Sequence, residues 1–97
     1  MENETIKIGN VEVKSRVMLA PMAGITDVVL RGLVRKFSKT CLLTTEMISS
    51  EALMQKKGGE ILERCDDETP LAYQISGHKP FMMAKAAKML EERADII

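Results

Sequence analysis

The 97-residue sequence has few of the residues that build metal centres, disulfide frameworks or membrane spans. It contains two cysteines, one histidine and no tryptophan. Cys41 and Cys65 match no zinc-binding spacing, and a single histidine cannot form a histidine-rich site. No apolar run approaches the roughly 18 residues that a membrane span needs. The first ten residues lack the basic and apolar regions of a secretory signal, so we expect a protein of the reducing cytoplasm.

An excess of charge of either sign is also missing. Lys and Arg total 14, as do Asp and Glu, so the formal net charge is zero. The chain therefore lacks the positive surplus typical of a self-sufficient nucleic-acid-binding domain. Hydrophobic residues make up 45% of the chain and charged residues 29%, which predicts a folded domain rather than a disordered one. Both cysteines are predicted to pack as small core residues.

The first recognisable pattern, over residues 5–14, is that of a β-hairpin. Apolar residues alternate with polar ones on both sides of Gly9-Asn10. This dipeptide readily adopts the positive φ angles of a two-residue hairpin turn. Next, "RVMLA" at 16–20 has the near-continuous apolar character of a strand buried on both faces.

An amphipathic helix is expected after the Pro-Met-Ala-Gly segment at 21–24. Thr26 is predicted to be its N-cap, with Asp27 placed well at the positive end. Apolar residues recur with helical spacing and predict a buried face, while the basic residues between them predict a solvated face. The two sets are Leu30, Leu33, Val34 and Phe37 for the buried face, and Arg31, Arg35 and Lys36 for the solvated one.

Strands are then expected at 41–47 and 70–76, with a fourth beginning at 94–97. Ser49 or Ser50 is predicted to cap a short helix that Gly58-Gly59 ends. Residues 60–69 are predicted to form a polar connection that includes one helical turn. Pro80 is predicted to occupy a first helical position, in a helix whose packing face includes the following residues: Met82, Met83, Ala86, Ala87, Met89 and Leu90.

The order of these elements, a hairpin followed by β-α-β-α-β-α-β, predicts an α/β fold with a parallel sheet and right-handed crossovers. Because the sequence stops within the fourth strand, we expect residues 1–97 to be the N-terminal portion of a larger protein. A (β/α)8 TIM barrel takes about 250 residues. The chain would then supply about three and a half βα units of such a barrel.

Ligands of parallel α/β folds bind at the carboxyl ends of the strands. Pro21 ends strand pairing, Met22 offers a polarizable surface, and Ala23 and Gly24 allow a flat ligand to approach the backbone. The Gln74 amide can pair with an edge that presents both a donor and an acceptor, such as the pyrimidine edge of a flavin. These residue types alone leave open an ordinary strand-to-helix turn with a core methionine.

Three strings resemble the opening motifs of the tRNA-dihydrouridine synthases: "VMLAPMAGITDVVLRGLVRKF", "TEMISSEAL" and "PLAYQISGHKPFMMAKAAKMLEERADII". The resemblance implies a TIM-barrel flavoprotein whose hairpin, residues 5–14, closes the barrel bottom. It implies reduction of selected uridines in tRNA to 5,6-dihydrouridine, with FMN as cofactor and NADPH as reductant. The target base would leave its stack to reach the flavin.

The resemblance also implies roles for individual residues. Pro21, Met22 and Ala23 would line the flavin ring, and Gln74 would hydrogen-bond its pyrimidine edge. Glu46 would lie on the uridine side of the pocket, or would instead be a structural carboxylate that holds the adjacent loops. The family's cysteine acid is expected beyond residue 97, so no catalytic residue is assigned here.

Two alternatives remain at this point. One is another FMN-dependent barrel, such as an ene-reductase, against which "GITD" and "QISG" argue. The other is a non-catalytic regulatory or RNA-binding barrel. In any of these cases, strand edges without partners invite pairing with another chain. We therefore expect the 97-residue chain alone to oligomerise, to aggregate or to bind FMN only weakly.

Overall fold

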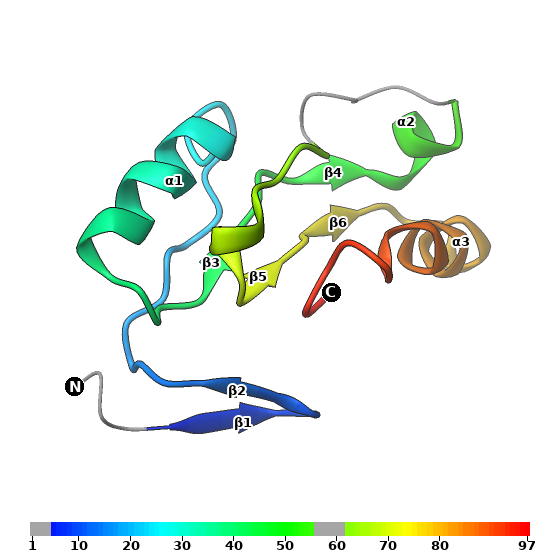
Figure 1. Cartoon of the computed structure of the whole chain (residues 1–97). Helices are drawn as coiled ribbons and strands as arrows, with labels where there is room; N and C mark the ends of the chain where they lie inside the picture. The colour runs from blue at the N-terminus through cyan, green and yellow to red at the C-terminus, as the bar shows by residue number, and fades with distance from the viewer. Residues whose placement is uncertain (1–4, 56–61) are drawn as a thin grey trace.

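The computed structural model describes residues 5–55 and 62–97 (Figure 1). Strands β1 (Ile6–Ile8) and β2 (Val11–Val13) form the predicted antiparallel hairpin. Gly9 at its turn has φ +58°, a conformation that favours glycine. The end of this hairpin lies close to residues that precede two of the parallel strands. Glu12 and Lys14 of the hairpin line a small hollow together with Thr40 and Pro70.

The parallel strands follow one another in chain order. Met18 forms a parallel bridge with Leu42, next to strand β3 (Leu43–Thr44). Strand β3 pairs in parallel with β5 (Leu71–Ala72), and Ala72 in turn bridges to Ile96. Strands β4 (Ile48–Ser49) and β6 (Ile75–Ser76) form a second parallel pair just beyond the first (Figure 1). The predicted alternation of parallel strands and helices is confirmed.

The strands themselves are shorter than predicted. The region 41–47 contains only β3, and β4 begins just after it, whereas the region 70–76 contains both β5 and β6. The pairs β3–β5 and β4–β6 are separate two-stranded sheets. The segments 16–20 and 94–97 contribute only the bridges at Met18 and Ile96. The prediction that 16–20 is buried on both faces is wrong, because Met18 is 43% exposed. Within the described part of the chain this segment has a strand neighbour on one side only.

One face of the sheet carries the hydrophobic core. Alternate residues point to it from β3 and β5, and the helices α2 (Ser50–Met54) and α3 (Pro80–Leu90) supply the rest. The core consists of Cys41, Leu43, Ile48, Leu53, Leu71, Tyr73, Ala86 and Leu90. Cys41 is therefore a small core residue, as predicted.

The opposite face of the sheet is only partly covered. The register of the parallel pairs sets Met18, Leu42, Thr44, Ala72 and Ile96 on it. Leu42 is buried, whereas Met18 is exposed and the other three are partly exposed. The helices cover the core face instead, where Val34 of the first helix packs against the core that includes Leu53 of α2 and Leu90 of α3.

Helix α1 (Val28–Phe37) departs most from its prediction. Asp27, not Thr26, is the N-cap, and its side chain accepts a hydrogen bond from the Leu30 amide at 2.8 Å. The buried and solvated faces are largely exchanged relative to the prediction. Arg31 and Arg35 are 1% and 5% exposed, while Leu33 and Phe37 are 51% and 86% exposed.

The exchange has a local cause in the connection before β5. Arg31 forms a buried ion pair with Glu68, the last residue of a 3-10 turn at Asp66–Glu68. Arg35 donates to the carbonyl oxygens of Asp67, Glu68 and Cys41 at 2.7 to 2.8 Å. Buried carbonyls and carboxylates need donors, and two guanidinium groups on one helix face supply them.

Some of the remaining local predictions are confirmed and others are wrong. Ser49 caps α2 by accepting from the Ala52 amide at 3.2 Å, and Pro80 occupies the first turn of α3, as predicted. Met89 is about half exposed, so its predicted packing role is wrong, and Cys65 is exposed rather than a core residue. The predicted stop at Gly58-Gly59 lies outside the described residues. Among the described helices, none has the length and apolar character needed to cross a bilayer.

Candidate functional site

The predicted site residues each follow one of the parallel strand segments, at its carboxyl end. Pro21, Met22 and Ala23 are exposed in the turn that follows the first strand segment. Glu46 follows β3 and is partly buried, and Gln74 follows β5 and is exposed. Glu46 and Gln74 continue the alternation that sets Thr44 and Ala72 on the partly covered face of the sheet.

The turn at 21–24 is held by Thr26, whose side chain is fully buried. The Thr26 hydroxyl accepts a hydrogen bond from the Met22 amide at 3.1 Å and donates one to the Met22 carbonyl at 3.2 Å. The Met22 carbonyl also accepts from the amides of Ile25 and Thr26, at 3.0 and 2.9 Å. Gly24 has φ +75°, so the turn needs glycine there.

Glu46 ties this turn to the second strand. Its Oε1 accepts a hydrogen bond from the Gly24 amide at 2.5 Å, across 22 residues of sequence. Such a contact is what a structural carboxylate that holds the adjacent loops would make, which was the second alternative for Glu46. The second carboxylate oxygen has no hydrogen bond to the described part of the chain.

The backbone of Gln74 is fixed on both sides. Its amide donates to the buried Thr45 hydroxyl at 3.1 Å, and its carbonyl accepts from the Ile48 amide at 2.8 Å. Its side-chain amide makes no hydrogen bond to residues 5–55 or 62–97. The carboxyl end of β5 thus presents an amide with donor and acceptor functions that is not used within the described part of the chain.

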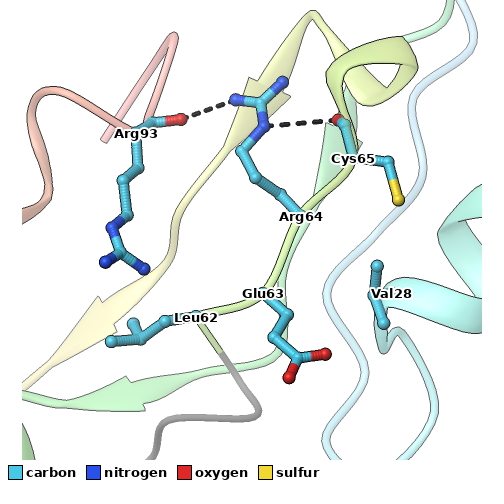
Figure 2. Close-up of a pocket in the computed structure, with 6 residues that line it drawn as sticks. All are labelled: Val28, Leu62, Glu63, Arg64, Cys65 and Arg93. Atoms are coloured by element: carbon cyan, nitrogen blue, oxygen red, sulfur yellow. Dashed lines mark hydrogen bonds between the residues drawn. The ribbon is translucent and has the colours of Figure 1, made fainter.

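Two hollows of similar size lie away from the strand ends. One, of about 530 Å³, is lined by Val28, Leu62, Glu63, Arg64, Cys65 and Arg93 (Figure 2). The Arg64 guanidinium donates hydrogen bonds there to the Arg93 carbonyl at 2.5 Å, the Thr69 hydroxyl at 2.6 Å and the Cys65 carbonyl at 3.4 Å. None of the predicted site residues lines this hollow, so it is separate from the strand-end site.

Sequence reasoning found the residues of the strand ends but missed the role of Thr26. It assigned Thr26 as the N-cap of the helix, but the N-cap of α1 is the next residue, Asp27. A threonine two residues after a glycine, in a segment with no regular structure, was the available signal, because Ser and Thr hydroxyls commonly close local turns.

Comparisons with known proteins agree on one family. A family model described as "Dihydrouridine synthase (Dus)" matches residues 18–97. A "Probable tRNA-dihydrouridine synthase" of Rickettsia bellii is 42% identical over 91 residues, which are 90% of this chain and 27% of that protein. The "Probable tRNA-dihydrouridine synthase" of Treponema pallidum is 33% identical over 92% of this chain and 26% of its own length.

A third relative carries a more specific name. The "tRNA-dihydrouridine(20/20a) synthase" of Vibrio parahaemolyticus is 40% identical over 78 residues, which are 80% of this chain and 24% of that protein. The chain spans about a quarter of the length of the curated relatives it matches.

Proposed function

The chain belongs to the dihydrouridine synthase family, and from this premise we propose that it serves a flavin-dependent enzyme that reduces uridine to 5,6-dihydrouridine in tRNA. The observation that carries the proposal is the meeting of three strand ends at one edge. There the exposed Pro21–Ala23 turn and the Gln74 amide lie on ordered backbone.

We propose that the segment forms the opening part of a (β/α)8 barrel. Its parallel strands follow one another in chain order, as barrel strands do. Its helices pack on one face of the sheet, and the other face, with Met18, Thr44 and Ala72, is left partly exposed. In a barrel this second face would become the interior, with the hairpin at the opposite end from the site.

The residues of the edge fit the flavin that the family implies. The free Gln74 amide matches the alternating donors and acceptors of the pyrimidine edge, and Pro21, Met22 and Ala23 offer an exposed surface for the ring. FMN, once bound and reduced by NADPH, would supply the hydride for the uracil ring. The chain's own residues would hold the ring plane and its edge.

The substrate is proposed to be a uridine of tRNA that has left its stack. Glu46 lies beside the turn and accepts a hydrogen bond from its Gly24 amide, so both alternatives for it, a place on the uridine side and a carboxylate that holds the loops, remain open to test. None of the residues assigned to the site is proposed as the proton donor. The family membership favours this reaction over the ene-reductase alternative, and a tRNA-modifying enzyme would work in the cytoplasm.

The test uses the complete open reading frame that contains these 97 residues. We expect the purified protein to carry flavin absorbance and to form dihydrouridine in tRNA that lacks it, measured by mass spectrometry of digested tRNA. Gln74→Leu is expected to lower the bound flavin, because it removes both polar functions at similar size. Gln55→Leu, at an exposed residue after α2, is the matched control.

Two outcomes would contradict the proposal in different ways. A protein that stays colourless when FMN is supplied would exclude the flavin site. A yellow protein that forms no dihydrouridine would favour the ene-reductase or the non-catalytic barrel instead.

A further inference from the structure

We propose that Glu46 and Thr26 are positioning residues for the cofactor, because together they fix the Met22–Gly24 turn against the end of β3. This inference rests on the proposed flavin site and adds two residues that act through the turn. Neither needs to touch the cofactor to do so.

The Thr26 side of this arrangement is buried and doubly bonded. The hydroxyl has no solvent exposure, and it engages both the amide and the carbonyl of Met22 at 3.1 and 3.2 Å. A single hydroxyl donates and accepts at once, whereas an aliphatic side chain offers neither function and an ionised carboxylate only accepts. Thr26 therefore fixes the start of the turn from the helix side.

The Glu46 side holds the far end of the turn. Its carboxylate accepts from the Gly24 amide at 2.5 Å, and a hydrogen bond to an ionised acceptor is roughly twice as strong as a neutral one. Gly24 needs such a restraint more than other residues do, because glycine has the largest conformational freedom to lose. At φ +75°, it lies in a region that few other residues adopt.

The restraint matters for binding because a ligand that lies against backbone gains affinity when that backbone is already ordered. Without the carboxylate, the Gly24 end of the turn would be free, and flavin binding would have to order it. The expected consequence is weaker FMN binding with little change in the folded core. A role in contacting uridine would instead alter turnover and leave FMN affinity unchanged.

The experiment titrates FMN itself into the protein that carries the complete flavin site, with quenching of flavin fluorescence as readout. Glu46→Ala is expected to weaken FMN binding about tenfold or more, equivalent to about 1.4 kcal/mol. Glu46→Gln retains an acceptor oxygen and is expected to recover part of that affinity. Thr26→Val should behave like Glu46→Ala, and Thr26→Ser should stay close to the parent protein.

Glu51→Ala is the matched carboxylate control, because Glu51 lies on α2 and pairs with Lys79 at 3.8 Å, with 44% of the Glu51 side chain and 58% of the Lys79 side chain exposed. Its FMN affinity should equal that of the parent. Circular dichroism of each variant establishes that the fold is retained, and the Gln and Ser variants keep the test decisive if an Ala or Val variant does not fold.

The outcomes separate the two levels of inference. If the parent protein binds no FMN, the proposed function itself fails. If the parent binds FMN, and Glu46→Ala and Thr26→Val bind it equally well, only the positioning role is overturned. Glu46→Gln binding no better than Glu46→Ala would also overturn the role assigned to the acceptor oxygen.

Discussion

Replacing Arg31 by methionine tests the least expected feature of the fold. Arg31 and Glu68 are 1% and 0% exposed and form an ion pair inside the seam between α1 and the connection before β5. The Arg31 guanidinium also donates to the carbonyls of Thr26 and Glu63, each at 2.8 Å. Arg31→Met keeps a long side chain but leaves the Glu68 carboxylate buried with the Cys65 amide as its remaining hydrogen-bond partner.

The expected loss follows from the uncompensated charge. Removing one partner of a buried ion pair costs about 3–5 kcal/mol, because the remaining charge stays out of water. A domain of this size has a free energy of unfolding of about 5–15 kcal/mol. Arg31→Met should therefore remove a large share of the stability, in contrast to the exposed pair of Lys88 and Glu91 at 2.9 Å, where Lys88→Met should have no measurable effect.

Urea unfolding of the protein from the complete open reading frame, followed by circular dichroism at matched protein concentration, measures both variants. The double variant Arg31→Met/Glu68→Leu also removes the carboxylate that Arg31→Met leaves buried without its ion-pair partner. Its loss of unfolding free energy should therefore differ from the sum of the Arg31→Met and Glu68→Leu losses by about 1–3 kcal/mol. An Arg31→Met variant within about 0.5 kcal/mol of the parent would refute the reasoning, since solvated surface substitutions have effects of that size. Strict additivity in the cycle would refute the pairing with Glu68.

Four further predictions use single residues or the chain as a whole. Burial raises the pKa of Tyr73, so its phenolate absorbance should appear above about pH 10 in the folded chain and near 10 in urea. Because the unfolded chain loses this proton first, stability should fall as pH rises through that window, and Tyr73→Phe should remove this slope. Gly32→Ala should raise the unfolding free energy in urea by up to about 1 kcal/mol, since nothing lies within 4 Å of the added Cβ. Gly77→Ala should lower it, because the added Cβ meets the Ser50 hydroxyl, and Ser50→Ala should relieve part of the loss. The 97-residue chain alone should self-associate through its sheet edges, and a monomer with stoichiometric flavin in size-exclusion chromatography would contradict this.

The strand-end site illustrates what sequence can and cannot specify. Proline, small residues and a glutamine at the ends of apolar runs indicated which residues follow the parallel strands, because parallel strands bring their carboxyl ends to one edge. The hydrogen bond from Gly24 to Glu46 spans 22 residues. Sequence raised a loop-holding carboxylate as one alternative but did not identify its partner.

Local chemistry determined several elements outright. Alternation around Gly9-Asn10 specified the hairpin, Ser49 specified the start of α2, and Pro80 specified the start of α3. In each case the deciding interaction lies within a few residues, as with the Ser49 side chain and the Ala52 amide. The sequence alone suffices where the physical partners are neighbours in the chain.

Tertiary structure decided which face of α1 is buried. Helical spacing assigned Leu33 and Phe37 to the core and the arginines to water, because isolated charges are costly to bury. The connection at 66–68 reverses this, since Glu68 and the nearby carbonyls lie 32 to 37 residues away in sequence and supply the partners that make burial of Arg31 and Arg35 tolerable. Periodicity reports the polarity of a face, whereas only the fold determines whether a buried charge finds its counterpart.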